Sequence, residues 1–409
     1  MLLKKRLINK SFKVCEIIYI FSYSIYLIVS ILNLSLYATL LPAIATHIIM
    51  LMCIGLLFII ELLQKSISKK NIIFLLIAFT MAIILYSKNY LIAVMFLFYI
   101  GARNIKIDSF LRVTVVVSSA VLLFVVLSSQ LGIIKDYICI SDTTNRTRHF
   151  LGFTYVLFPS GILFNITIAY VYLKRLELSI KHYIIVLFVN ILMFDLTQAR
   201  LNFILCLIVV MLCITKNIVF KSCIVKYGFA FSFVLCMITS YVLIISYSPS
   251  RTLLNKLNIM LEDRLYLGHE GFNNYNILPF GQTVFFNGYG LSAAGDQIIS
   301  GKYNYVDNYY ENILLRFGFV FLVLIILWYT YAGIIAVRRK DYICLIAIAA
   351  FAIHGMVDDL IVNLYYNCLG IMAGRIILGD YNENRERLQQ VIIKMLGRNT
   401  ALSVKKRME

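Results

Sequence analysis

The sequence is poor in charged residues and in proline, and each shortage excludes a class of protein. Only 14% of its 409 residues are charged, whereas 61% are hydrophobic, and the mean hydropathy is +0.86. A water-soluble domain needs more polar surface than this, so the composition predicts an integral membrane protein. Four prolines and the lack of a Gly/Ser-rich linker give no sign of a separate soluble domain.

The sequence also lacks the spacings that bind metals and nucleotides. Of its nine cysteines, only Cys139 falls in a predicted outer loop, so no disulfide framework is expected. No paired Cys/His spacing suggests zinc. A Walker motif and an Asp-x-Asp pair for a metal-bound nucleotide sugar are both missing from the sequence. We therefore expect neither a metal nor a cofactor.

Long apolar runs without polar alternation predict membrane helices and exclude a β-barrel. We predict an all-α membrane protein with about twelve transmembrane helices. The predicted spans are 17–37, 40–62, 71–87, 90–102, 113–134, 154–172, 182–199, 201–215, 228–247, 310–336, 342–357 and 360–378. The even number is a firmer prediction than the count itself, since several spans are short for a bilayer.

Lysine and arginine occur in alternate connections, among them "QKSISKK" at 64–70, "RNIK" at 103–106 and "RRK" at 338–340. The positive-inside rule then places both termini in the cytoplasm. The basic N-terminal segment is predicted to remain as a signal anchor. The net charge of +18 is explained by topology and by attraction to anionic lipid, so no nucleic-acid partner is needed.

The predicted organisation is a membrane domain over 1–378, followed by a cytoplasmic tail over 379–409. One large extracytoplasmic loop, 248–309, separates the ninth and tenth helices. A basic helix with one apolar stripe, lying on the inner membrane surface, is one interpretation of the tail. A disordered basic tail is the alternative. The stripe consists of Leu388, Val391, Ile392, Met395 and Leu396.

Four segments, in their order along the chain, resemble one bacterial family. They are "RTRHFLGFTYVLFPSGIL" at 146–163, "DLTQARLNFILCLIVVML" at 195–212, "NGYGLSAAGDQ" at 287–297 and "DNYYENILLRFG" at 307–318. Together they resemble the O-antigen and capsular polysaccharide polymerases (Wzy class) of the O-antigen ligase–polymerase superfamily. Asp307 stands where the ligases usually carry histidine, and this departure favours the polymerase side.

The resemblance implies a GT-C-like, multi-pass enzyme of the bacterial cytoplasmic (inner) membrane that is independent of metals. Its substrates would be undecaprenyl-pyrophosphate-linked glycans, which it would join on the extracytoplasmic face. Membrane lipids, a chain-length regulator and a flippase are the further partners implied. An O-antigen ligase-type transferase and a polysaccharide flippase or transporter are the alternatives. A transporter would more naturally show mid-membrane charges, broken helices or repeated halves.

Such a reaction needs cations that bind the departing pyrophosphate, and arginine with its fork of donors suits this role. Arg200 is the first candidate, because an arginine at the outer end of a helix needs an anionic partner. Snorkelling to lipid headgroups or pairing with Asp195 is the alternative. Further candidates are Arg146, Arg148 and Arg264, for which a solvated loop position is the alternative.

The reaction also needs a base, and Glu311 and Asp307 are the catalytic candidates. Their spacing of four residues places both carboxylates on one helical face. Asp307 has a structural alternative as a helix N-cap. For Glu311 the alternative is a salt bridge with Arg316 or Arg264.

Sugar binding is assigned to residues of the long loop and its end, namely Asn308, His269, Gly288 and Gly290. The two glycines let the backbone approach a sugar, but a plain tight turn explains them equally well. Asp358 and Asp359, near the outer end of a helix, either hold sugar hydroxyls or mark the membrane interface.

Overall fold

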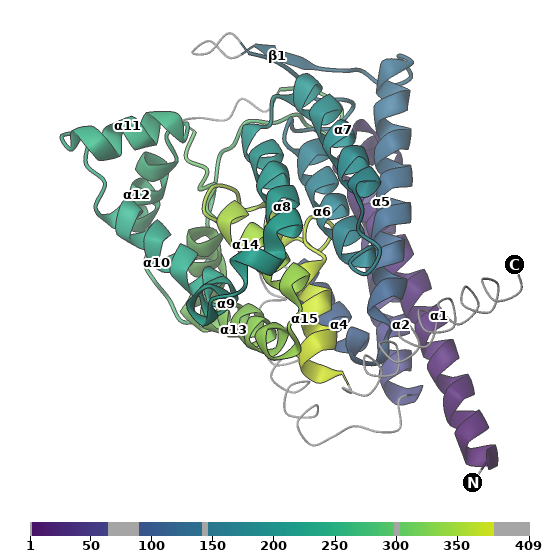
Figure 1. Ribbon diagram of the computed structural model, residues 1–409. Helices are drawn as coiled ribbons and strands as arrows, with labels where there is room; N and C mark the ends of the chain where they lie inside the picture. Colours follow the sequence, from purple (N-terminus) through teal and green to yellow (C-terminus); the bar gives the residue numbers. More distant parts are fainter. Residues whose placement is uncertain (1, 64–89, 141–145, 298–302, 380–409) are drawn as a thin grey trace, which may run out of the picture.

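The chain is described by a computed structural model that covers residues 2–63, 90–140, 146–297 and 303–379 (Figure 1). Its α-helices are α1 (Leu2–Leu32), α2 (Ala43–Leu63), α4 (Tyr90–Gly101), α5 (Ile107–Gln130), α6 (Phe158–Leu173), α7 (Ile180–Thr197), α8 (Arg200–Val219), α9 (Cys223–Ala230), α10 (Ser232–Ile245), α11 (Thr252–Met260), α12 (Arg264–Asn274), α13 (Tyr309–Arg339), α14 (Tyr342–His354) and α15 (Leu369–Leu378).

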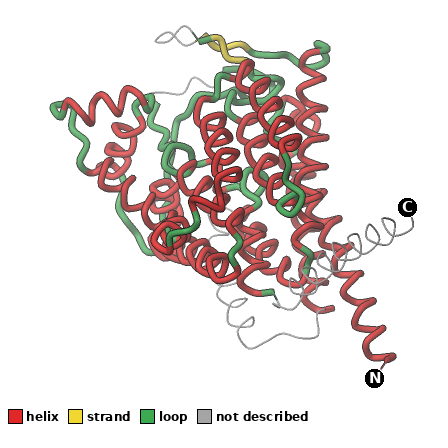
Figure 2. Tube along the Cα trace, viewed as in Figure 1, coloured by secondary structure: helices red, strands yellow, loops and turns green. Residues whose placement is uncertain are grey.

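Short 3₁₀ helices and one hairpin join these helices. The 3₁₀ helices are η1 (Leu36–Leu40), η2 (Ala102–Asn104) and η3 (Leu360–Val362). Strands β1 (Ile138–Ile140) and β2 (Thr147–His149) pair antiparallel, and Figure 2 shows them in yellow beside the helices. The protein is thus mostly helical over its described ranges, as predicted, with a small β-hairpin that the sequence reading did not foresee.

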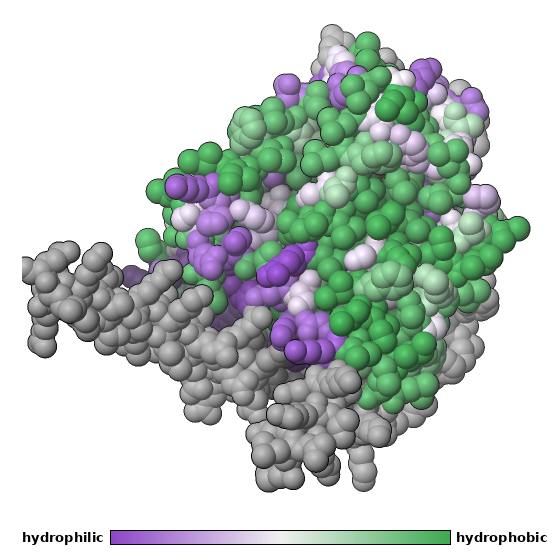
Figure 3. All heavy atoms as spheres, turned by 90° about the vertical axis from the view of Figure 1, so that its right-hand side faces the viewer, coloured by the Kyte–Doolittle hydropathy of each residue, from purple (hydrophilic) through white to green (hydrophobic). Residues whose placement is uncertain are grey.

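The helices form a bundle whose outer surface is apolar. Six of the described helices, α1, α2, α5, α7, α8 and α13, are long and apolar enough to cross a membrane. The bent pair α9 and α10 would add a seventh span. Figure 3 shows a broad hydrophobic surface over the upper and right-hand part of one face of the molecule, with hydrophilic side chains at the top and in a group toward the left of this surface. Because such a surface is stable against lipid but not against water, these helices embed the protein in a membrane.

The total of twelve spans stays a prediction, because the segment 71–87 lies outside the described residues. Several expected spans are interrupted or shortened. The span predicted over 228–247 is broken between α9 and α10, which are bent by 67° relative to each other. The last span, over 360–378, is helical only as η3 and α15. The start of α15 is capped from the side, since Asn165 accepts from the N–H of the N-cap Cys368 and Asn367 accepts from the N–H of Leu369.

The span predicted over 310–336 lies within α13, which is broken at Gly318. Gly318 has φ 88° and ψ 166°, a conformation that is almost restricted to glycine. The N–H groups of Phe319 and Val320 donate to the carbonyls of Leu278 (3.1 Å) and Pro279 (3.2 Å) of the long loop. The break therefore separates a short helix over 309–317 from a long one over 319–339, and the loop caps the second.

At the end of the bundle opposite the long loop, Arg103 is buried, with 1% of its surface exposed, and forms a bidentate ion pair with Glu61. Arg375 of α15 donates to the carbonyl of Arg103 at 2.8 Å. The sequence reading counted Arg103 among the basic residues of a cytoplasmic connection. Its burial shows that this arginine of the basic cluster holds helices together.

Candidate functional site

Four connections meet at one end of the bundle, which we call the distal end because it lies at the C-terminal end of α1. Thr154 N–H donates to the carbonyl of Leu34 at 2.9 Å, and Leu291 N–H of the long loop donates to the carbonyl of Thr154 at 2.8 Å. Tyr309 N–H, at the start of α13, donates to the carbonyl of Gly355, just after α14. These backbone hydrogen bonds fix the long loop to the distal helix ends and so position the side chains between them.

The N-terminus of α13 presents Asp307 to the site because its neighbour caps the helix. Asn308 is the N-cap, and its side-chain oxygen accepts from the N–H groups of Tyr310 (3.0 Å) and Glu311 (3.2 Å). The sequence reading placed Asp307 and Glu311 on one helical face and gave Asp307 a capping alternative. Both statements are wrong for Asp307, because it precedes the cap and lies outside the helix. Its carboxylate is thereby available for other partners.

Three aspartates form what we call the carboxylate cluster, namely Asp307, Asp358 and Asp359. Tyr303 donates its hydroxyl to Asp307 at 3.1 Å. Tyr305 (2.8 Å) and Asn312 (3.0 Å) both donate to Oδ2 of Asp359. The long loop, the start of α13 and the α14–α15 connection each contribute to this cluster.

Burial and mutual repulsion make these carboxyl groups less acidic. Burial, together with the charge of Asp359, raises the pKa of Asp358 to about 8, although Arg264 opposes the shift. Burial and the charge of Asp307 raise the pKa of Asp359 to about 7. Burial also raises the pKa of Asp307, more than Arg264 lowers it. A carboxyl group whose pKa is close to neutral exchanges protons readily at physiological pH.

Arg264, the first residue of α12, faces the carboxylate cluster. Its Nε lies 3.6 Å from Oδ2 of Asp307, and this buried nitrogen has no hydrogen-bond partner among the described residues. Burial alone would lower the pKa of Arg264, but the charges of Asp307 and Asp358 outweigh it and raise that pKa. Arg264 therefore remains a cation, and its long ion pair leaves a donor for a ligand oxygen.

Two more arginines approach Arg264 from the β-hairpin. Arg146 forms an ion pair with Glu262, two residues before Arg264. Arg148 donates from Nε to the carbonyl of Thr197 at 3.2 Å. Partial burial would raise the pKa of Glu262, but Arg146, Arg148 and Arg264 together lower it. We call the three arginines the arginine cluster; the structure brings together three of the four cations predicted from the sequence.

Arg200, the fourth, begins α8 but stands apart. Its side chain is exposed, and the described structure shows no ion pair between Arg200 and Asp195. Its neighbour Asn202 is buried. The side-chain oxygen of Asn202 accepts from Nε2 of His354 at 2.7 Å, and its amide nitrogen donates to Oγ of Ser160 at 2.9 Å. Among the described residues, Arg200 lies in neither of the ion pairs that build the arginine cluster.

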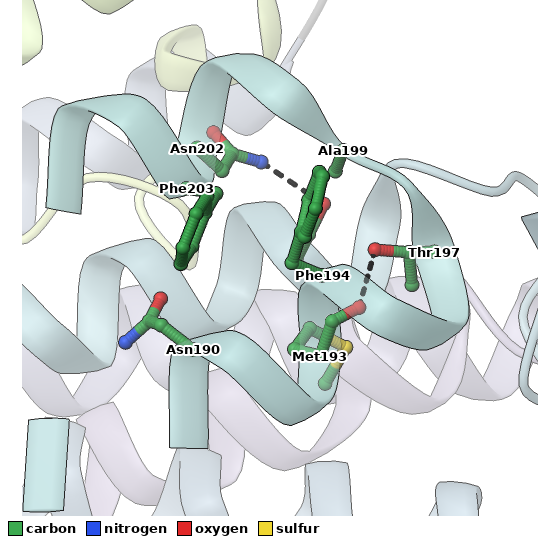
Figure 4. A pocket seen from close by; sticks show the side chains of 8 residues that line it. Asn190, Met193, Phe194, Thr197, Ala199, Asn202 and Phe203 are labelled. Carbon is green, nitrogen blue, oxygen red and sulfur yellow. Dashed lines mark hydrogen bonds between the residues drawn. The ribbon is translucent and has the colours of Figure 1, made fainter. Parts of the chain in front are cut away.

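A small pocket lies between α7 and α8 beside this junction (Figure 4). Its wall combines amide and hydroxyl groups with two phenylalanine rings that stack at 4.7 Å. The lining residues are Ser160, Asn190, Met193, Phe194, Thr197, Ala199, Asn202 and Phe203. Neither cluster contributes a side chain to this wall, but Arg148 of the arginine cluster donates to the carbonyl of Thr197, which lines the pocket.

Glu311 is sealed beneath α12. None of its surface is exposed, and neither carboxyl oxygen has a hydrogen-bond partner among the described residues. A Cβ atom added to Gly268 or Gly271 of α12 would lie 2.5 Å from one of these oxygens. The alternative prediction of a salt bridge with Arg316 or Arg264 is wrong, because Arg264 pairs with Asp307 and Glu311 forms no ion pair within the described part of the chain.

The residues predicted to bind sugar are spread over the distal end. Asn308 is occupied as the helix cap and also donates to the carbonyl of Met356 at 2.9 Å. His269 lies on α12, with Nδ1 3.2 Å from the carbonyl of Ile244. Gly288 packs on the ring of Tyr305, where a Cβ would come within 3.2 Å, and Gly290 lies beside the carbonyl of Thr154. The glycine segment thus touches the cluster through Tyr305.

Sequence reasoning missed the donors that surround the carboxylates. Tyr155, which is coupled electrostatically to Asp307, Arg264 and Arg148, was passed over within a segment chosen for its arginines. Tyr303, Tyr305 and Asn312 were not singled out, although "YNYVDNYYEN" at 303–312 is dense in hydroxyl and amide groups. That density was the available signal. Within the described ranges, no three His, Cys, Asp or Glu side chains are grouped to hold a metal ion.

No protein-family model, curated protein or solved structure matches this chain. The functional argument therefore starts from the charged site itself.

Proposed function

We propose that the protein is a membrane polysaccharide polymerase that joins undecaprenyl-pyrophosphate-linked repeat units at the distal end, on the extracytoplasmic face. The observation that carries the proposal is the contact between a cationic and an acidic half-site. Arg264 reaches Asp307 at 3.6 Å, with Arg146 and Arg148 on one side and two further aspartates on the other. Transfer of a glycan from a diphosphate carrier to a hydroxyl requires both halves.

The arginine cluster would hold the diphosphate of the donor. Guanidinium groups bind phosphate oxygens through paired, charge-assisted hydrogen bonds, which strengthen as negative charge develops on the leaving group. Arg264 is the best placed, because it is buried, cationic and has an unused donor. Arg148 is also largely buried, and burial lowers its pKa without neutralising it.

The carboxylate cluster would activate the acceptor. The hydroxyl oxygen of the incoming unit forms a bond to the anomeric carbon of the donor glycan while its proton passes to a carboxylate. The bond from that carbon to the diphosphate oxygen breaks, and undecaprenyl pyrophosphate leaves with the bonding electron pair. A positioned base of suitable pKa contributes roughly 10²- to 10⁴-fold to such a rate.

Asp359 and Asp307 are better placed for this role than Glu311. Tyr305 and Asn312 orient Asp359, and its pKa of about 7 suits a base at neutral pH. Glu311, the base predicted from the sequence, is covered by α12, so it reaches a substrate only if that helix moves. Asp307 and Asp359 are the proposed acceptor bases, and the tyrosine hydroxyls offer hydrogen bonds to sugars.

Deletion of the gene in its bacterium, with surface glycan separated on a gel, tests the proposal. A polymerase predicts loss of the ladder with single repeat units retained, and restoration by the wild-type gene. Finished lipid-linked polymer that accumulates without transfer would identify a ligase instead. Repeat units trapped on the cytoplasmic leaflet would identify a flippase, and an unchanged ladder would reject all three.

A further inference from the structure

Helix α11 presents an apolar outer face that the bundle does not cover. Leu253 is 83% exposed, Met260 is 79% exposed and Ile259 is 66% exposed. The opposite face is anchored, since Leu254, Leu257 and Leu261 pack against a small core of Ile244, Tyr247 and Leu265. Because its inner face is well packed, the exposure of the outer face does not result from loose packing of α11. Exposure of this apolar face to water would be unfavourable.

The position of α11 identifies what lies against this face. It follows α10, whose exposed Ile238, Val242 and Ile245 form part of the lipid-facing surface, after a turn at residues 246–251. Figure 1 shows α11 lying across the direction of α5 and to one side of the other helices. A helix turned in this way at the end of a membrane helix continues the apolar surface along the plane of the bilayer.

The charges on α11 match a headgroup layer. Lys256 lies between Leu253 and Met260 on the exposed face, and Arg251 is exposed just before the helix begins. A lysine at this place can extend its amine to lipid phosphates while its stem remains in the apolar layer. No acidic residue lies within α11 itself. The combination of apolar and basic side chains fits an anionic membrane surface better than an aqueous one.

We infer that α11 is an interfacial helix that docks on the lipid headgroups of the leaflet at the distal end. Glu262 and Asp263, both with left-handed backbone angles (φ 54° and 64°), turn the chain directly from α11 into α12 and Arg264. Docking of α11 would thus hold Arg264 close to headgroup depth. This last consequence rests on the proposed function, because the diphosphate of a lipid-linked substrate lies at headgroup depth.

The test uses tryptophan fluorescence of the full-length protein in vesicles of phosphatidylethanolamine and phosphatidylglycerol. The chain has one tryptophan, Trp328, which is buried and gives a constant background. Met260→Trp adds a reporter on the exposed face of α11. Ala294→Trp, in an exposed turn of the long loop, is the matched control. Lipids brominated on their acyl chains quench only tryptophans that enter the membrane.

We expect brominated vesicles to quench the added fluorescence of Met260→Trp at least twofold, and that of Ala294→Trp much less. Equal quenching of the two variants would overturn the inference. The inference would also be overturned if a second copy of the chain covered the exposed face of α11. In that case the fluorescence of Met260→Trp would be quenched only after the protein is diluted in lipid. The assay needs no glycan substrate, so its outcome is independent of whether the protein proves to be a polymerase.

Discussion

The break in α13 can be tested by replacing Gly318 with alanine. Its φ of 88° and ψ of 166° cost a residue with a side chain about 1–3 kcal/mol. A Cβ atom there would lie 2.3 Å from the carbonyl oxygen of Pro279 and 2.4 Å from the nitrogen of Gly281. Both are backbone atoms, which cannot rotate away as a flexible side chain would. The loop must therefore shift.

Such a shift weakens the hydrogen bonds that Phe319 and Val320 donate to the loop carbonyls. Each N–H left without a partner costs about 1–3 kcal/mol. With the backbone strain included, we expect Gly318→Ala to lose about 3 kcal/mol or more of stability. In a thermal unfolding assay of the purified protein in detergent, its Tm should be several degrees lower than that of the wild type.

The matched control is Gly55→Ala in the middle of α2, where a Cβ atom would meet nothing within 4 Å. This change should be neutral or slightly stabilising, by at most about 1 kcal/mol, because alanine favours a helix over glycine. A Gly318→Ala protein with the Tm of Gly55→Ala would refute the assigned backbone geometry and the proposed capping by the loop.

Three further predictions concern the site. Arg264→Lys should reduce polymer formation in membrane vesicles by roughly ten- to a hundredfold, because lysine cannot form paired hydrogen bonds to a diphosphate; Arg251→Lys, on the exposed turn, should not. Folding favours the protonated form of Asp358, whose pKa is raised to about 8, so the Tm of the wild type should fall as pH rises toward 8. Asp358→Asn should show a smaller fall. Glu311→Leu should raise the free energy of unfolding by about 1–3 kcal/mol, since it removes a buried carboxyl without partners, and a Tm below that of the wild type would contradict this.

The positions of most described helices could be predicted from the sequence, because apolar run length is a local property. The break at Gly318 could not, since it depends on Leu278 and Pro279, which approach from a distant loop. A glycine within an apolar run is compatible with a straight helix as well as a kink. The local sequence around Gly318 does not determine whether the helix is straight or kinked there.

The site was predicted in part for the same reason. Asp307 was chosen because an acid beside a membrane segment is unusual, and the structure places it against Arg264. The burial of Glu311 could not be foreseen, because Gly268 and Gly271 seal it only when α12 packs on α13. The spacing of these glycines indicates that another segment packs closely on α12, but it does not show which segment this is.

The ion pair between Arg264 and Asp307 connects the two halves of the proposed reaction. Arg264 lowers the pKa of Asp307 against the effect of burial, so Asp307 is a weaker base while the pair is intact. A diphosphate that binds Arg264 competes with Asp307 for the same guanidinium and weakens that pair. The pKa of Asp307 then rises, and its carboxylate gains affinity for the proton of the acceptor hydroxyl. Binding of the donor would therefore make Asp307 a stronger base. Before the donor binds, Asp307 would still be paired with Arg264, so it would be a weaker base toward water in the site.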